Sequence, residues 1–472
     1  MIEFGTGGWR AVIGDGFTRQ NIQLLAKAMS MKMKREGVED QGIVIGYDRR
    51  FLSKEAVKWA CEVFVAEGIR CLFVNRSSPT PLVMFYVEKH KLPYGMMVTA
   101  SHNPAIYNGF KVFTYGGRDA SAEQTQEIEA YARSVKQEEI RWIEYEKAKA
   151  SGLVEEFNPL NEYLDNIIDK IDMKAIRDRG LHVVLDPMYG VSQTAIKTIL
   201  STARCEIDLI HETHDTLFGR RMPAPSRESL TELCKYVTEM DCDLGIATDG
   251  DADRLGVVDD TGKYLHANDI LVLLYYYLLK YKGWHGPAVR NVATTHLLDR
   301  IAESFGEKCY EVPVGFKYIS AKMTQTGAII GGESSGGMTV RGHINGKDGI
   351  YAASLLVEMI AVTGKKLSEL MKEIEQQYGR CHVAELSRSF PSERREELKK
   401  LLYEDKLLPA FARPIERVSY LDGCKVYFKD GGWVIARFSG TEPLLRVFGE
   451  MEDEETAQQY CRDFFHFLGI DE

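Results

Sequence analysis

Apolar and polar positions in the first part of the chain follow two alternating periods. Residues 21–35 carry apolar side chains at helical spacing, whereas residues 42–47 form a short β-branched run. The pattern repeats, with predicted helices at 21–35, 56–67 and 81–89 and predicted strands at 42–47, 71–75 and 95–98. Such alternation with short connections predicts a parallel sheet covered by helices, whose ligands bind at the carboxyl ends of the strands.

The alternation continues beyond a charged segment at 124–150, which we predict to be helical and to lead out of the first unit. Later strands are predicted at 181–185, 244–247, 291–294 and 328–330, with a buried helix from Asp269. After Gly379 the pattern changes. We expect a charged helix at 394–403, a hairpin of 424–428 with 432–438, and a closing helix at 456–468.

These patterns predict an α/β protein. We expect three successive α/β/α domains with mixed or parallel sheets and a smaller C-terminal α+β domain, with boundaries at 1–150, 151–258, 259–376 and 377–472. The length of 472 residues agrees with three or four domains of ordinary size. The three α/β units could be diverged repeats, although no residue-level periodicity links them.

Composition argues against several classes of protein, namely nucleic-acid-binding, zinc-binding, disulfide-rich secreted and membrane-spanning proteins. The net charge of −10 argues against a nucleic-acid-binding surface, which normally needs a basic face. The nine cysteines are scattered and form no CxxC pair, which argues against zinc and against a secreted disulfide framework. The longest apolar run, 270–279, is too short to span a membrane, and residues 1–10 do not resemble a signal peptide. We therefore expect a cytoplasmic protein without nucleic-acid or membrane partners.

A serine lies in the loop that follows the predicted strand at 95–98. Ser101 has small and polar neighbours, and Pro104 fixes the exit of the loop, so the serine could be an exposed nucleophile. An Asn-Pro turn without any catalytic role is the alternative. A nearby segment, 48–50, reads Asp-Arg-Arg and is interpreted as a structural ion-pair turn.

Three aspartates follow the predicted strand at 244–247. Asp249, Asp251 and Asp253 alternate with small residues, so one loop can direct three carboxylates at one hard cation. An EF-hand would need glycine at the sixth position of the loop and glutamate at the twelfth, where this chain has Arg254 and Asp260. The pattern therefore favours a different kind of metal site.

Two further loops offer polar ligands. Glu333 with Ser334 and Ser335 pairs a carboxylate with two hydroxyls, which suits vicinal sugar hydroxyls, and a flexible glycine turn is the alternative. The loop at 437–443 offers an arginine, hydroxyls and backbone N–H groups to a phosphate, and a plain connection between elements is the alternative. Its candidate ligands are Arg437, Ser439, Gly440 and Thr441.

Together these loops resemble those of the α-D-phosphohexomutase superfamily, which includes phosphoglucomutase, phosphomannomutase and phosphoglucosamine mutase. In chain order they are similar to its phosphoserine, metal, sugar-specificity and phosphate loops. The N-terminal Gly5-Thr6-Gly7-Gly8-Trp9-Arg10 is similar to the opening motif of the family, whose arginine enters the active site. The resemblance implies three α/β domains and a smaller α+β domain that closes on the substrate.

The resemblance also implies roles for single residues. Mg²⁺ would be held by phosphorylated Ser101 and the three loop aspartates, and Arg10 and Arg254 would balance the remaining charge. Lys111 resembles the acid/base candidate of the family, and neighbouring cations should lower its pKa. His102, adjacent to the nucleophile, is expected to position it or to act as an alternative base.

The resemblance also concerns two candidate substrate-binding lysines and one position where this chain differs from some relatives. Lys317 and Lys347 lie in segments similar to substrate-binding segments of the family. Some bacterial relatives have a histidine after the Glu-x-Ser-Gly core, but this chain has Gly337, so a histidine acid or base is absent at that place.

The resemblance therefore implies a phosphoglucomutase that interconverts glucose 1-phosphate and glucose 6-phosphate, with glucose 1,6-bisphosphate as intermediate and activator. A phosphomannomutase activity, a glucose-1,6-bisphosphate synthase and a phosphoglucosamine mutase are alternatives within the same chemistry. A sugar-phosphate-binding regulator or a metal phosphatase would belong to other classes. The intact Ser101, loop aspartates and Lys111 argue against the regulator. We expect a monomer or a homodimer.

Overall fold

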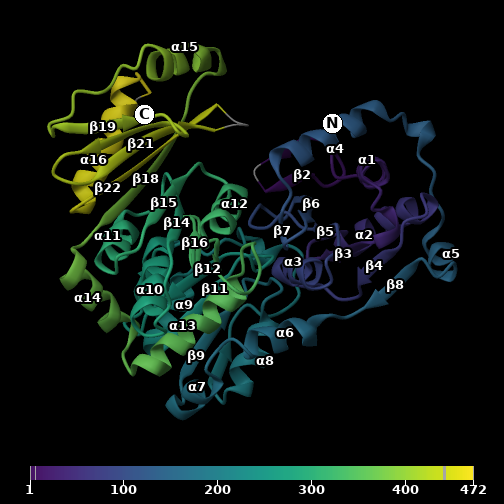
Figure 1. The fold of residues 1–472 in the computed structure, drawn as a ribbon, viewed down its shortest axis with the longest axis horizontal. Helices are drawn as coiled ribbons and strands as arrows, with labels where there is room; N and C mark the ends of the chain where they lie inside the picture. The colour runs from purple at the N-terminus through teal and green to yellow at the C-terminus, as the bar shows by residue number, and fades with distance from the viewer. Residues whose placement is uncertain (1, 6, 440–442, 471–472) are drawn as a thin grey trace.

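The computed structural model describes residues 2–5, 7–439 and 443–470. Within these residues the strands form four sheets, which Figure 1 shows as successive units, the first on the right and the last at the upper left. The first three units combine parallel and antiparallel strands with helices, whereas the fourth sheet is antiparallel throughout. The fold is therefore α/β, as the sequence predicted.

The first sheet has the strand order β1-β2-β6-β5-β3-β4-β8, with β7 paired to β6. Its strands are β1 (Phe4–Gly5), β2 (Gly8–Val12), β3 (Ile43–Tyr47), β4 (Cys71–Val74), β5 (Tyr94–Val98), β6 (Tyr107–Thr114), β7 (Arg118–Asp119) and β8 (Val154–Phe157). Its helices are α1 (Arg19–Glu36), α2 (Ser53–Ala66), α3 (Thr80–Lys89), α4 (Ala122–Ser134) and α5 (Tyr145–Ala150).

The prediction of a helical segment at 124–150 that leads out of the first unit is confirmed only in part, because the segment contains two helices with a break between them. α4 ends at Ser134, the backbone of Val135 is extended, and α5 begins only at Tyr145. Instead of leading outward, α4 packs against α1 of the same unit and buries Ile128 and Ala132. A charged helical pattern shows that a helix has an exposed face, but not where the chain turns.

The second sheet has the order β10-β9-β11-β12-β13 and the third β15-β14-β16-β17. Their strands are β9 (His182–Asp186), β10 (Glu206–Leu209), β11 (Leu244–Thr248), β12 (Leu255–Val258), β13 (Tyr264–Leu265), β14 (Ala288–Asn291), β15 (Cys309–Val312), β16 (Ile330–Gly332) and β17 (Met338–Val340). Their helices are α6 (Leu160–Ile168), α7 (Met173–Arg179), α8 (Gln193–Thr202), α9 (Thr231–Glu239), α10 (Ala267–Lys280), α11 (Leu297–Ser304), α12 (Phe316–Thr326), α13 (Gly349–Thr363) and α14 (Leu367–Tyr378). The strands predicted at 291–294 and 328–330 were misplaced by a few residues, because β14 ends at Asn291 and β16 starts at Ile330.

The fourth sheet has the order β18-β22-β21-β20-β19. Its elements are β18 (His382–Ser389), α15 (Arg395–Lys399), β19 (Ile415–Ser419), β20 (Cys424–Phe428), β21 (Trp433–Phe438), β22 (Leu444–Met451) and α16 (Glu454–Phe467). The predicted hairpin is confirmed as β20 paired with β21, and a π-helical turn at Lys400–Glu404 continues α15 over much of the predicted charged helix.

The first three units share one arrangement around their chemically distinctive loops. In each, the carboxyl end of a parallel strand leads through a loop into an antiparallel neighbour: β5 to β6, β11 to β12, and β16 to β17. Ser101, the three aspartates and Glu333 lie in these loops. This common placement, rather than any sequence repeat, supports the interpretation of diverged units.

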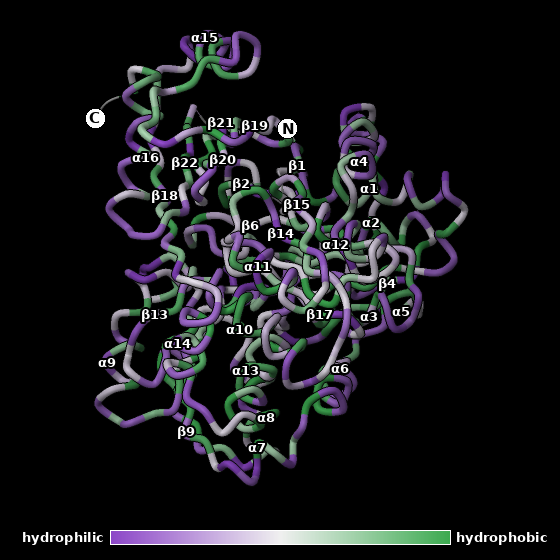
Figure 2. Tube along the Cα trace, turned by 60° about the vertical axis from the view of Figure 1, so that its left-hand side comes forward, coloured by the Kyte–Doolittle hydropathy of each residue, from purple (hydrophilic) through white to green (hydrophobic). Residues whose placement is uncertain are grey.

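The interior is built from apolar strands and from two buried helices. α10 and α13 are buried along nearly their whole lengths, and Tyr275, Tyr276 and Tyr277 of α10 lie in the core. Figure 2 shows hydrophobic positions concentrated inside the molecule and hydrophilic positions at its periphery. Among the described helices, none has the length and apolar character needed to cross a membrane. The domain boundaries remain predictions, and β8 and β13 extend the first and second sheets past 150 and 258.

Candidate active site

The serine loop connects two neighbouring strands of the first sheet, β5 and β6. Ser101 is buried, and its φ of 51° lies in the left-handed region that serine seldom adopts. Its Oγ donates a hydrogen bond to Asp249 Oδ2 at 2.7 Å, which joins the serine loop to the aspartate loop. A backbone held in this region by its surroundings is frequent at functional sites.

Arg50 holds the serine loop in place. Its guanidinium donates to four carbonyl oxygens at 2.6–2.9 Å, those of Ser101, Asn103, Pro104 and Tyr107. Asp48 lies 3.4 Å from Arg50 Nε, which confirms the predicted ion pair. The contact between Arg50 and the serine loop was not predicted. It could have been inferred from the sheet, because residues 48–50 follow β3 and the serine loop follows β5, the direct neighbour of β3.

The aspartate loop joins β11 to β12 and gathers three buried carboxylates. One oxygen from each of Asp249, Asp251 and Asp253 lies within 4.8 Å of the others. Ala252 has a φ of 62°, which tightens the turn. The Oδ1 atoms of Asp251 and Asp253 are buried without a hydrogen-bond partner among the described residues. Because such oxygens are costly to bury unpaired, and hard cations prefer oxygen ligands, the three side chains fit a Mg²⁺ ion.

Lys111 of β6 contacts the aspartates directly. Its Nζ donates to Asp251 Oδ2 at 2.6 Å and to Asp253 Oδ2 at 2.5 Å. The predicted lowering of its pKa was wrong. Burial alone lowers the pKa of Lys111, but Asp251, Asp253 and Asp249 raise it above its ordinary value. The lysine is therefore protonated in this arrangement.

The carboxyls of the loop differ in their pKa values. Burial and the charges of Asp251 and Asp253 raise the pKa of Asp249 well above its ordinary value. Burial acts on Asp253 in the same direction, but Lys111 and Lys347 hold the pKa of Asp253 below its ordinary value. Lys347 Nζ lies 2.9 Å from Asp253 Oδ2. Despite burial, the pKa of Asp251 is also lowered, by Lys111 and by the hydrogen bond from Thr80, so the negative charge lies on Asp251 and Asp253 rather than on Asp249.

His102 and two arginines flank the serine. His102 Nδ1 lies 3.3 Å from Ser101 Oγ, and burial, followed by the charges of Arg254 and Arg10, lowers the pKa of His102 to about 2. The imidazole is therefore neutral and suits positioning better than proton acceptance. Arg10 of β2 donates to Asn103 Oδ1, and the buried Nε of Arg254 has no hydrogen-bond partner among the described residues.

The loop of Glu333 lies between β16 and β17 and touches the aspartate loop. Leu255 N donates to Gly336 O at 3.1 Å, so the second and third units meet through backbone at this point. Glu333 is buried, and its Oε1 accepts from Asn291 Nδ2 at 3.1 Å and from Gly315 N at 3.0 Å. Ser335 is exposed on the same loop.

Lys347 occupies the space beside Gly337. A Cβ atom at Gly337 would overlap Lys347 Cδ, so no larger residue fits there without moving the lysine. The aliphatic part of the Lys347 side chain therefore fills the space that a histidine side chain at position 337 would need. Lys317, near the start of α12, lines a small cavity together with Gly7, Lys111 and Asp119.

The fourth loop is linked to the third unit through Asp422. Arg437 Nη2 donates to Asp422 Oδ2 at 2.8 Å, and the same oxygen accepts from Val314 N at 2.7 Å. Val314 precedes Gly315, which binds Glu333. Ser439 O accepts from Arg395. Gly440 and Thr441 lie outside the described residues. In Figure 1, the end of the sheet where β21 gives way to β22 points toward the first unit.

The structure thus brings Ser101, His102, Lys111, Lys347 and the aspartates into direct contact. Several partners were missed, among them Thr80, whose Oγ1 donates to Asp251 Oδ2 at 2.6 Å. Asn291 on Glu333 and Asp422 on Arg437 are others. No local motif marks these residues, although Thr80 at the start of α3 and Asn291 at the end of β14 share the strand-end placement of the loops.

Comparisons with known proteins agree with this arrangement over nearly the whole chain. Models of the phosphoglucomutase/phosphomannomutase family match residues 1–139 (α/β/α domain I), 161–262 (domain II), 266–378 (domain III) and 391–467 (C-terminal domain). A phosphoglucomutase/phosphomannomutase from Thermococcus kodakarensis is 29% identical, with 97% of this chain and 96% of the relative aligned. A "probable phosphoglucosamine mutase" from Methanocella arvoryzae is 31% identical, with 97% and 96% aligned. The solved structure of a candidate phosphomannomutase from Thermus thermophilus has a TM-score of 0.86 and 29% identity, and 99% of each chain is covered.

Fold, loops and matches define an enzyme that transfers a phosphoryl group within a sugar phosphate, an isomerase. The chain belongs to the phosphoglucomutase/phosphomannomutase family of the α-D-phosphohexomutase superfamily.

Proposed function

We propose that this isomerase is a phosphoglucomutase. The observation that carries the proposal is the buried Ser101 Oγ, which lies 2.7 Å from an oxygen of the three-aspartate cluster. Phosphorylated Ser101 would transfer its phosphoryl group to the free hydroxyl of a glucose phosphate, which forms glucose 1,6-bisphosphate and frees Oγ. After the bisphosphate turns around, Oγ would take the other phosphoryl group and release the isomer.

Mg²⁺ is the proposed cofactor, held by Asp249, Asp251, Asp253 and the phosphoryl group on Ser101. The two unpartnered Oδ1 atoms support this assignment. Bound Mg²⁺ supplies charge neutralisation to the transferring phosphoryl group. A phosphoserine adds roughly −1.5 to −2 to the charge of the three carboxylates, so Arg10 and Arg254 would balance what remains.

Lys111 is the proposed acid/base group. It is buried and protonated, and its two hydrogen bonds to the aspartates orient its Nζ. A protonated lysine can donate a proton to the departing serine oxygen and, once neutral, take one from a sugar hydroxyl. His102 would hold the serine oxygen in position, and Lys317 and Lys347 would bind the sugar phosphate.

The fourth loop is the proposed clamp for the phosphate that does not react, with Arg437, Ser439, Gly440 and Thr441 as ligands. Arg437→Ala should raise the KM for sugar phosphates by roughly 10–150-fold, because a charged hydrogen bond contributes about 1.5–3 kcal/mol. Steady-state kinetics measure this. Arg446→Ala is the matched control, since Arg446 is exposed and directly opposite Arg437 in the sheet. An unchanged KM for Arg437→Ala would refute this role.

Glu333 and Ser335 are proposed to bind the 3- and 4-hydroxyls of the sugar. Galactose 1-phosphate, a 4-epimer, should be rejected by at least about 10-fold in kcat/KM, because a misplaced hydroxyl leaves a buried partner unpaired at about 1–3 kcal/mol. Mannose 1-phosphate, which differs from glucose 1-phosphate at carbon 2, should be a slower second substrate. Glu333→Gln should weaken all accepted sugars alike, whereas Glu303→Gln, on the exposed face of α11, should change none. Equal efficiency for galactose and glucose 1-phosphates would contradict the role of this loop.

Phosphoglucosamine mutase is the second candidate, because several relatives of similar identity carry that name. Coupled assays of the purified protein with glucose, mannose and glucosamine 1-phosphates distinguish the substrates. Turnover that needs only catalytic glucose 1,6-bisphosphate supports a mutase. A requirement for a stoichiometric phosphoryl donor would favour glucose-1,6-bisphosphate synthase instead.

A further inference from the structure

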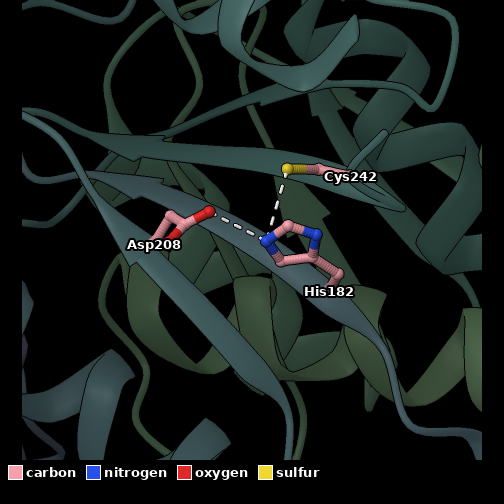
Figure 3. A group of neighbouring side chains, drawn as sticks. All are labelled: His182, Asp208 and Cys242. Carbon is pink, nitrogen blue, oxygen red and sulfur yellow. Dashed lines mark hydrogen bonds and ion pairs between the residues drawn. The ribbon is translucent and has the colours of Figure 1, made fainter. Parts of the chain in front are cut away.

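Three metal-ligating side chains converge at the amino-terminal edge of the second sheet. His182 is the first residue of β9, Asp208 lies on the neighbouring β10, and Cys242 precedes β11 on the other side. One ligand atom from each lies within 4.8 Å of the others. Figure 3 shows the carboxylate and the sulfur approaching the imidazole from two directions.

Both neighbours approach the same ring nitrogen. Asp208 Oδ2 lies 2.8 Å from His182 Nε2, and Cys242 Sγ lies 3.7 Å from that nitrogen. A proton relay of the hydrolase type would use both ring nitrogens, one for the acid and one for the nucleophile. A single Nε2 carries at most one proton, so it cannot donate well to both groups. A cation among the three atoms would satisfy all of them.

The distances suit a tetrahedral ion. Zinc bonds of about 2.3 Å to sulfur and about 2.0–2.1 Å to nitrogen place these two ligands roughly 3.5 Å apart, close to the observed 3.7 Å. The carboxylate would have to retreat from Nε2 by about half an ångström to reach the corresponding N–O separation. Imidazole, thiolate and carboxylate are together a zinc-type set, whereas Mg²⁺ and Ca²⁺ prefer oxygen alone.

The backbone fixes the relative positions of the ligands. His182 N donates to Asp243 Oδ2 at 2.8 Å, and Asp243 N donates to His182 O at 2.8 Å. Cys242 itself is buried in a small core with Leu233 and Val237.

We propose that His182, Asp208 and Cys242 bind one zinc-type divalent cation, with a fourth position open to water. This site is separate from the aspartate loop. Cys242 and Asp249 lie beyond opposite ends of β11, at most about 23 Å apart at roughly 3.3 Å per residue. The spacing of the cysteines gave no sign of this site, because its ligands come from three separate parts of the chain and leave no CxxC motif.

Titration of the full chain with Co²⁺ in excess Mg²⁺ tests the proposal, because Mg²⁺ keeps the aspartate site occupied. We expect one equivalent of Co²⁺ to produce a thiolate-to-cobalt charge-transfer absorption that added Zn²⁺ removes. Cys242→Ser should abolish this absorption. Asp208→Asn should weaken binding at least as much as the roughly 10–100-fold cost of losing an outer-shell partner. Zn²⁺ should raise the Tm of the wild type more than that of Cys242→Ser.

Cys205→Ser is the matched control. Cys205 precedes β10 at the same edge of the sheet, but it packs against the core on the opposite face. Mutase turnover in each variant reports folding, because none of the substituted residues belongs to the active site. Absence of stoichiometric binding, an absorption that survives Cys242→Ser, or its loss in Cys205→Ser would each overturn the proposal.

Discussion

Ser101→Ala should lower turnover by at least about 10⁴-fold, because removal of the nucleophile leaves no group to carry the phosphoryl moiety between sugars. The Ser101 hydroxyl contributes little to holding the loop in its conformation. Its Oγ contacts Asp249 and His102, and its backbone is held independently by Arg50 and by Thr99, whose Oγ1 accepts from Ser101 N at 2.8 Å. The loop should therefore keep its conformation without the hydroxyl, so that lost activity reports chemistry. Steady-state rates measure the loss of activity, and circular dichroism shows whether the variant is folded.

Phosphate mapping adds a second readout for the same variant. In the wild type, a fraction of Ser101 should carry phosphate, which intact mass and peptide mapping detect, and Ser101→Ala should carry none at this loop. Ser335→Ala removes a serine hydroxyl from an exposed position in the loop between β16 and β17, and this variant should keep the phosphate on Ser101. If Ser101→Ala were fully active and phosphate were found only on other residues, the proposed phosphoserine mechanism would be wrong.

Much of the candidate site could be predicted from the positions of loops at strand ends. Parallel strands place their carboxyl ends at one edge of a sheet, so a loop after such a strand is a candidate ligand loop even without a partner in view. Ser101, Asp249 and Glu333 were selected as candidates in this way, and the structure places each of them after a parallel strand. That these loops meet across three sheets could not be predicted by pattern alone, because the contacts join residues far apart in the chain, as between Ser101 and Asp249 with a separation of 148.

The residues that support the site were harder to predict. Arg50, Thr80 and Asn291 act through contacts to loops far away in sequence, and isolated polar residues near strand and helix ends are common in any α/β protein. Their role depends on packing between units, which local periodicity does not report. The break between α4 and α5 within the predicted helical segment 124–150 was missed for a related reason, since charge patterning does not show where a helix ends.

The direction of the Lys111 pKa shift could not be predicted without knowing which charged groups surround its Nζ. The predicted lowering assumed that Lys111 lies beside other cations, but in the structure its Nζ faces the carboxylates of Asp251 and Asp253. The sign of the pKa shift depends on which charges are closest, and these neighbours come from another unit of the fold.

Asp251→Asn should lower both the affinity for Mg²⁺ and the turnover, the latter by about 10²–10³-fold, as expected when a preorganised charge is removed from a phosphoryl-transfer site. The two carboxylate oxygens of Asp251 have different surroundings. Oδ2 accepts from Lys111 and Thr80, each at 2.6 Å, whereas the buried Oδ1 has no hydrogen-bond partner among the described residues and suits the proposed cation. Asparagine keeps the shape and one acceptor, but it removes the charge and places an amide at one of the two oxygen positions. Rate measurements across a Mg²⁺ titration should show a shifted and depressed saturation curve.

A second variant distinguishes the loss of a charge at Asp251 from the loss of a charge elsewhere in the protein. Asp178→Asn removes the same charge from an exposed position of α7 in the second unit and should leave the Mg²⁺ curve unchanged. Isothermal titration of Mg²⁺ into each variant measures affinity without turnover, so a folding defect would appear as a lowered stoichiometry rather than a weaker Kd. Wild-type turnover of Asp251→Asn at limiting Mg²⁺ would show that the three aspartates do not hold the metal. A loss of turnover with unchanged Mg²⁺ affinity would instead assign Asp251 to the orientation of Lys111, because that hydrogen bond is the other interaction that the substitution alters.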